Sequence, residues 1–207
     1  ESTLFSNIIK KSLLEKDGSI NKNLYSKDKV FFNEVGKDFI LKAKKEFSIF
    51  DINNNSKIIS VKEFDFCLIG FIKLIFPQAK IIHTIRNPLD NCISLFKNLF
   101  EGGVDFSYNL IELGEYYNFY SEIMNFWENT LPKSFKTFNY EEVVNNKEKE
   151  VKKMLEYCDL QWNENCMQSH KFIHSMSTGT NSINIHQPMY KSSIQYWKKY
   201  EEQLKPL

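Results

Sequence analysis

Apolar residues follow two different spacings along the chain, and their alternation predicts an α/β fold. The run at 79–85, AKIIHTI, predicts a strand, and its nearly continuous apolar character is typical of a parallel strand covered on both faces. A β-branched run at 57–61, KIISV, and the start of 134–144, SFKTFNYEEVV, predict two more strands. Helical patterns separate these runs, so we expect a central parallel sheet flanked by helices.

Helical spacing covers most of the remaining chain. It predicts helices over 3–14, 28–48, 64–75, 88–100, 110–129 and 147–158, and helical structure in SSIQYWKKYEEQL near the C-terminus. Pro77 ends the third of these helices. Asn87 is a good cap for the fourth, with Pro88 and Asp90 in its first turn. Neither a repeat nor a linker interrupts the pattern, so we predict a single domain over 1–207.

Composition narrows the class of function. The net charge of +1 gives no support to a general role on nucleic acid or on a membrane surface, so a bound anion needs a local site. No segment reaches the roughly 20 apolar residues of a membrane helix. The four cysteines lack the spacing of a disulfide framework, as is typical of reduced thiols in the cytoplasm. We therefore expect a cytoplasmic protein with no nucleic-acid or membrane partner.

The candidate chemistry begins at the end of the strand over 79–85. Ligands of open α/β sheets bind beyond the carboxyl ends of the strands, and Arg86 is the first residue after this strand. Its guanidinium can grip a phosphate with two hydrogen bonds, and Ser94, two turns into the next helix, can add a hydroxyl. The alternative is a surface arginine that pairs with a carboxylate such as Asp90.

The segment FPQAKIIHTIRNPLDNCISLFKNLF, residues 76–100, resembles the 3′-phosphate-binding element of sulfotransferases that use 3′-phosphoadenosine 5′-phosphosulfate (PAPS). It looks most like the bacterial branch often fused to tetratricopeptide repeats, and more distantly like tyrosylprotein sulfotransferases. Further matches follow in order: FSYNLIELGEYYNFYSEIMNFWENTLP, NYEEVV, YCDLQWNENCMQSH and QPMYKSSIQYWKKYEEQLKPL. The resemblance implies a P-loop-type sulfotransferase fold and in-line transfer of a sulfuryl group from PAPS to a hydroxyl or amine acceptor. Adenosine 3′,5′-bisphosphate would be the product, and no metal is needed.

The resemblance also implies nucleotide-binding residues. Arg86 and Ser94 match the pair that holds the 3′-phosphate, and Tyr140 matches a tyrosine near the nucleotide. Lys191 and Ser192, with the neighbouring serine, match a late element that folds over the cofactor. The alternatives are a core aromatic at Tyr140 and a solvated helix start capped by serine at 191–193.

The 5′-phosphosulfate loop of the family matches only the first residues of this chain. Ser2 and Thr3 align with its hydroxyl residues, while Glu1 stands where the family has glycine. We therefore expect an N-terminally truncated domain that lacks its first strand and most of this loop. Tetratricopeptide repeats are expected to precede it in a longer protein.

The catalytic assignments rest on weaker matches. Lys62 matches the family's lysine that neutralises the leaving oxygen, although one residue is missing between it and Gly70. An exposed lysine at a strand end is the alternative. Glu63 is our candidate for the base that takes the acceptor proton, with Glu15 and Glu34 as further candidates. The acceptor is left open as a carbohydrate, a peptide or a small alcohol.

Two departures support a second hypothesis, a non-catalytic relative that binds a nucleotide or a partner. The family has an arginine at His186 and a basic residue at Tyr196, so each departure removes a positive charge. A third reading is a zinc site, because Cys166, His170 and His174 are spaced four apart and would share one face of a helix. We assign no metal.

Overall fold

The computed structural model describes residues 14–15, 19, 21–46, 65–100, 103–171 and 191–207. The chain divides into two compact units, Glu1–Ala79 and Lys80–Leu207, and each is described by itself. The strand predicted over 57–61 lies outside the described residues, as does all of the helix predicted over 3–14 except Leu14, which forms a β-bridge.

The first unit is helical in its described part. It contains η1 (Lys22–Ser26), α2 (Lys29–Glu46), η2 (Asp65–Leu68) and α3 (Ile69–Ile75). This confirms the helix predicted over 28–48, while the one predicted over 64–75 begins with a 3₁₀ turn. The core consists of Leu24, Phe32, Val35 and Ile75, surrounded by partly buried apolar side chains of the same helices. Gly36 lets the backbone of Ile75 approach, since a Cβ at that position would lie 3.0 Å from its carbonyl oxygen.

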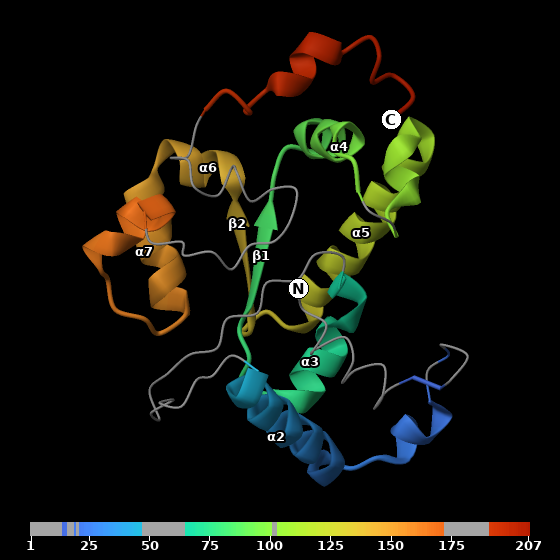
Figure 1. Cartoon of the computed structure of the whole chain (residues 1–207), viewed down its shortest axis with the longest axis vertical. Coiled ribbons are helices and arrows are strands. Elements are labelled where there is room, and N and C mark those ends of the chain that lie inside the picture. Colours follow the sequence, from blue (N-terminus) through green and yellow to red (C-terminus); the bar gives the residue numbers. More distant parts are fainter. Residues whose placement is uncertain (1–13, 16–18, 20, 47–64, 101–102, 172–190) are drawn as a thin grey trace. The chain divides into compact units, whose positions relative to one another are not determined.

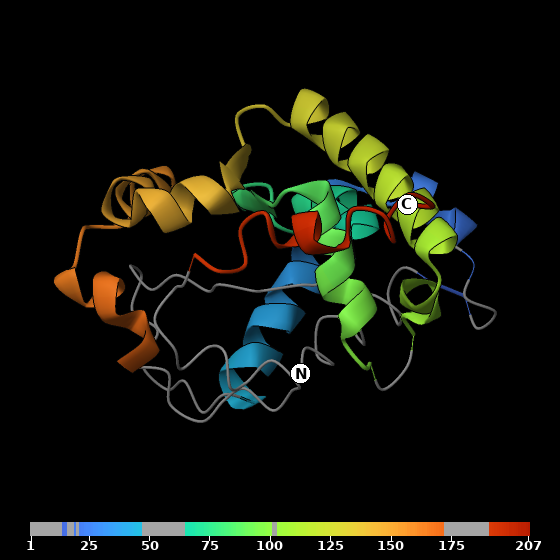
Figure 2. The same ribbon diagram turned by 90° about the horizontal axis from the view of Figure 1, so that it is seen from above.

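The second unit is built on two parallel strands, β1 (Ile81–Ile85) and β2 (Phe135–Asn139). Their register pairs Ile81 with Phe135 and Ile85 with Asn139, so the two strands end side by side. Figures 1 and 2 show helices on both sides of the pair, with α4 (Pro88–Lys97) and α5 (Leu110–Thr130) on one side. On the other side lie α6 (Tyr140–Asn145) and α7 (Lys147–Tyr157). This confirms an α/β architecture with a parallel sheet.

Strand β1 is less covered than its sequence predicts. Its side chains alternate between half-buried and exposed, and Ile82 remains 37% exposed. The expected burial of both faces was therefore wrong. A continuous apolar run does not distinguish a strand buried on two faces from one buried mainly on one.

The start of α4 follows its capping residues. The Asn87 side chain accepts the backbone N–H of Asp90 at 3.1 Å, and Pro88 occupies the first turn, where no N–H is needed. The helix ends at Lys97, three residues earlier than predicted, because Asn98 is extended.

The C-terminal segment, residues 191–207, is held against α4. It contains the 3₁₀ helix η5 (Tyr196–Tyr200), preceded by Gln195 in a left-handed conformation (φ 60°) that interrupts the predicted helical pattern. The carboxylate of Asp90, which is 0% exposed, accepts the backbone N–H of Gln195 at 2.7 Å and that of Trp197 at 2.8 Å. In Figure 1 this segment (red) passes over α4. One buried side chain therefore anchors residues more than a hundred positions later.

Replacing Asp90 should destabilise the second unit. We expect Asp90→Asn to lower the free energy of unfolding by about 2–4 kcal/mol, because an amide lacks the charge and turns an N–H group toward one of the two backbone donors. Urea unfolding followed by tryptophan fluorescence measures this unit, since Trp127, Trp162 and Trp197 all lie in it. The matched control is Asp105→Asn at an exposed position, for which we expect a change within about 0.5 kcal/mol. Equal effects of the two substitutions would contradict the assignment.

Candidate functional site

A cavity of about 650 Å³ lies within the second unit. Its wall is formed by side chains from β1 and β2, from the start of α4, from α5 and α6, and from the C-terminal segment. The volume is in the range of small-molecule sites. The carboxyl ends of both strands contribute residues to it, which is where an open α/β sheet binds ligands.

Arg86 lies at this strand end, as predicted, and lines the cavity. Its Nη2 donates to the carbonyl oxygen of Ser193 at 2.6 Å, and its guanidinium carbon lies 5.3 Å from the centroid of the Tyr140 ring. The Tyr140 hydroxyl is 3.0 Å from the Ser193 hydroxyl. In contrast, Arg86 Nε is buried without a hydrogen-bond partner. The expected alternative, an Arg86–Asp90 ion pair, does not form, since Asp90 holds backbone N–H groups instead.

Glu141 is the second residue of this cavity with an unpartnered buried atom. Its Oε1 accepts the backbone N–H of Asn87 at 2.8 Å, while its Oε2 is buried with no partner. The strand register explains the contact: Ile85 pairs with Asn139, so the residues that follow each strand emerge side by side. This glutamate belongs to the segment NYEEVV, for which the sequence predicts a role only at Tyr140. Pairing the two strand ends in register would have placed Glu141 beside Asn87.

Ser94 lies on the face of α4 that the C-terminal segment covers. Asp90, Ser94 and Lys97 are spaced at i, i+4 and i+7 and so share this face. The C-terminal segment contacts the residues that flank Ser94 on this face. Asp90 accepts a backbone N–H of the segment, and Lys97 Nζ donates to the Tyr196 hydroxyl at 3.0 Å. Ser94 is half-buried there and does not line the cavity.

The two predicted site residues of the C-terminal segment do not contact Arg86. Lys191 and Ser192 are exposed, and the residue that contacts Arg86 and Tyr140 is Ser193. The four remaining predicted site residues lie outside the described part of the chain: Ser2, Thr3, Lys62 and Glu63.

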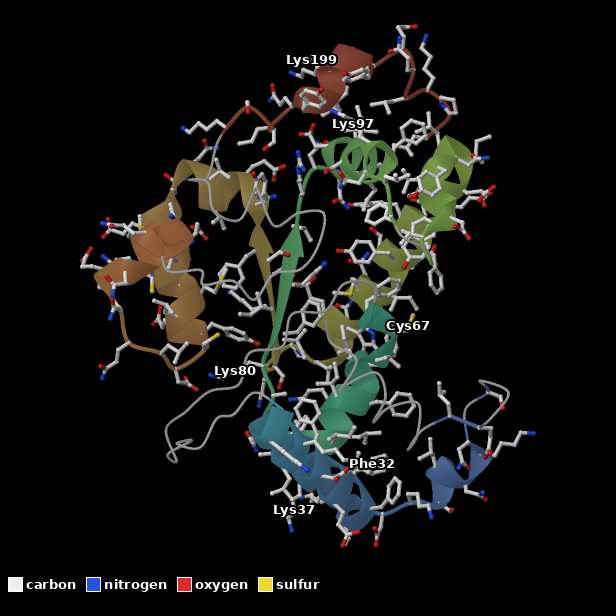
Figure 3. The ribbon with its side chains drawn as sticks, in the orientation of Figure 1. Phe32, Lys37, Cys67, Lys80, Lys97 and Lys199 are labelled. Carbon is white, nitrogen blue, oxygen red and sulfur yellow. The ribbon has the colours of Figure 1, made fainter. Side chains whose placement is uncertain are left out.

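Tyr196, where the resemblance led us to expect a missing positive charge, is flanked by two lysines. Lys97 Nζ lies 4.5 Å and Lys199 Nζ 5.0 Å from the centroid of its ring. Figure 3 labels these lysines on α4 and on the C-terminal segment. The hydrogen bond from Lys97 lowers the pKa of the Tyr196 phenol. Positive charge is thus present around this position.

The part of the cavity between α5 and the sheet is rich in polar side chains. His83 Nε2 is hydrogen-bonded to the Tyr120 hydroxyl, and Thr137 Oγ1 donates to Glu128 Oε1 at 3.0 Å. Burial lowers the pKa of His83, which the nearby Glu128 carboxylate partly opposes, and burial raises the pKa of Tyr120 to about 12. At neutral pH the His83 imidazole is therefore neutral and the Tyr120 phenol is protonated.

The alternative candidates for a base belong to the first unit, where Glu15 and Glu34 are both exposed. Of the three residues considered as zinc ligands, His174 lies outside the described residues, so this trio is not seen as a whole; His186 lies outside them too. Among the residues that are described, no group of three or more metal-binding side chains occurs. Nor does any described helix have the length and apolarity needed to cross a membrane.

The lowered pKa of His83 makes a prediction about stability. The unfolded chain takes up this proton near pH 6.5, and the folded chain only at lower pH, so the free energy of unfolding should fall as the pH drops below about 6.5. The same decline should be smaller in His83→Gln, which cannot titrate there. The other three histidines are present in both proteins and cancel in the comparison. Urea unfolding between pH 5 and 8 measures the two slopes, and identical slopes would sink the prediction.

Comparison with known proteins gives one relative and one family. A protein of Aquifex aeolicus (strain VF5), named only as an uncharacterized protein, is 27% identical over 158 residues, which are 75% of this chain and 21% of that protein. This chain therefore spans about a fifth of the length of that relative.

The family match covers the strand ends and the helices of the candidate site. The model of the sulfotransferase family matches residues 34–164, which contain Arg86, Ser94, Tyr140 and Glu141. This range is more than half of the 207 residues. The chain therefore belongs to the sulfotransferase family.

Proposed function

We propose that this protein transfers the sulfuryl group of PAPS to a hydroxyl or amine acceptor. Membership of the family indicates sulfuryl transfer in general. The observation that supports this donor is Arg86, a cavity-lining arginine at the end of a parallel strand, whose Nε is buried and unpartnered. A buried donor without a partner destabilises the free protein, so an anion that accepts from it is bound favourably.

The residues around Arg86 fit a nucleotide phosphate. Tyr140 packs against the guanidinium, and the Ser193 carbonyl accepts a hydrogen bond from one of its nitrogens. These two contacts orient the guanidinium and leave its Nε–H without a partner, so that it can donate to a phosphate oxygen. PAPS would supply an activated sulfuryl group and a stable leaving group. We assign to Arg86 the binding of the 3′-phosphate and to Tyr140 the orientation of its guanidinium. Ser94, which does not line the cavity, and the exposed Lys191 and Ser192 are assigned as further phosphate donors on the strength of the resemblance alone.

Holding the nucleotide in one orientation is the main contribution that these residues can make. Transfer between a fixed donor and a fixed acceptor needs no metal in this proposal, because positioning and electrostatic stabilisation of the developing charge lower the barrier. Lys62 is assigned to the leaving oxygen, Glu63 to the acceptor proton, and Ser2 and Thr3 to the 5′-phosphosulfate in a P-loop-type fold. The chain is proposed to work as part of a longer protein, as the length of its relative suggests.

Arg86 is the residue whose replacement tests the proposal most directly. In isothermal titration with adenosine 3′,5′-bisphosphate, we expect Arg86→Lys to bind roughly tenfold more weakly and Arg86→Ala roughly a hundredfold more weakly. A lysine keeps the charge but not the fork. Lys133→Ala removes a positive charge at an exposed turn and serves as the control, with unchanged affinity. Failure of the unsubstituted chain to bind the bisphosphate would overturn the donor assignment.

Binding and chemistry can be separated in a second measurement. Incubation with PAPS and a panel of phenol, alcohol, sugar and amine acceptors should yield a sulfated product and adenosine 3′,5′-bisphosphate. Binding of the bisphosphate without transfer to any acceptor would instead favour the non-catalytic alternative. That alternative rests on the departures at His186 and Tyr196.

A further inference from the structure

We infer that Glu141 is a specificity residue, which accepts the ribose 2′-hydroxyl next to the phosphate held by Arg86. This inference rests on the proposed function, since it takes the nucleotide bisphosphate as the ligand. It assigns a role to a carboxylate that neither the family match nor the sequence analysis singles out.

The starting observation is a pair of unsatisfied polar atoms in one site. In the part of the chain that the structure describes, three buried side-chain N or O atoms have no hydrogen-bond partner: Arg86 Nε, Ser107 Oγ and Glu141 Oε2. Two of these belong to residues that line the same cavity. Each unsatisfied atom costs free energy that a suitable ligand atom recovers.

Arg86 and Glu141 follow neighbouring strand ends without being paired with each other. Glu141 Oε1 accepts the N–H of Asn87, the residue directly after Arg86, and neither Arg86 Nε nor Glu141 Oε2 has a hydrogen-bond partner. Here the arginine is turned toward Tyr140 and Ser193, which leaves one donor and one acceptor without partners.

The chemistry of the two atoms defines the ligand. Arg86 Nε needs an acceptor, and Glu141 Oε2 needs a donor. A phosphate ester with a free hydroxyl on the neighbouring carbon supplies both, the phosphate oxygen to the arginine and the hydroxyl hydrogen to the carboxylate. In adenosine 3′,5′-bisphosphate these groups are the 3′-phosphate and the 2′-hydroxyl.

The same carboxylate disfavours the isomeric ligand. In adenosine 2′,5′-bisphosphate the phosphate and the hydroxyl exchange places, so a ligand bound in the same orientation directs its phosphate at Glu141. Two anions without an intervening proton repel each other, and this repulsion gives specificity against the wrong isomer. A single glutamate beside the arginine therefore selects the hydroxyl at one position and the phosphate at the other.

The test compares three nucleotides on the full chain by isothermal titration. We expect adenosine 3′,5′-bisphosphate to bind roughly tenfold or more tightly than its 2′-deoxy analogue, the effect of one hydrogen bond to a charged group. Adenosine 2′,5′-bisphosphate should bind more weakly than the deoxy analogue. In Glu141→Gln the preference over the 2′,5′ isomer should shrink, and in Glu141→Ala the ribo and deoxy nucleotides should bind equally.

Ratios of affinities distinguish recognition from a structural role. Glu141 also holds the N–H of Asn87, so its loss can weaken all three nucleotides together, but only direct contact with the 2′-position changes their ratios. Glu142→Ala, at an exposed neighbouring carboxylate, is the matched control and should keep the ratios of the unsubstituted chain. Equal binding of the ribo and deoxy nucleotides to the unsubstituted chain would overturn this inference and leave the proposed function intact. Binding of no nucleotide would overturn both.

Discussion

The arrangement of the candidate site depends on the buried carboxylate of Asp90. A fully buried charge is tolerated only when hydrogen bonds replace its hydration, and here two backbone N–H groups of the C-terminal segment do so. The same two hydrogen bonds also fix the C-terminal segment, because its N–H groups must lie where the Asp90 carboxylate can accept them. Its register on α4 follows, with Ser193 beside Arg86 and Tyr196 beside Lys97. The positions of these two contacts thus depend on one aspartate.

Local signals explain which parts of the fold could be predicted. The two described strands and the start of α4 are determined by apolar spacing and by Asn87 and Pro88, all within a few residues of the element concerned. The partner of Asp90 could not be predicted in this way, because it lies 105 and 107 positions away. Helical structure was predicted around η5, but its start after the left-handed Gln195 was not, because the backbone N–H of Gln195 bonds the distant Asp90.

The candidate site shows the same division between local and distant information. Arg86 and Ser94 were found from their places after a strand and in the helix that follows it, and the resemblance added Tyr140. Glu141 was missed because its importance comes from strand pairing and from burial, neither of which a single sequence displays. The sequence predicts a loss of positive charge at Tyr196, whereas in the structure the side chains of two lysines lie against its ring. The charge at a site depends on all the side chains that the fold brings together, so the residue type at one position does not determine it.

The parallel register of β1 and β2 has a consequence for how this site can change. Arg86 and Tyr140 lie directly after two strands of equal length whose first residues are paired, so the length of each strand determines which residues meet at the site. Inserting or deleting one residue within either strand would shift the residues that follow that strand by one position relative to those that follow the other. Their side chains would then point to the opposite face of the sheet. The loops that join the strands to α5 carry no such restriction, whereas α5 itself lines the cavity. We therefore expect natural variation in length to accumulate in the connections at 98–109 and 131–134 and to be absent from the ten strand residues that precede the site.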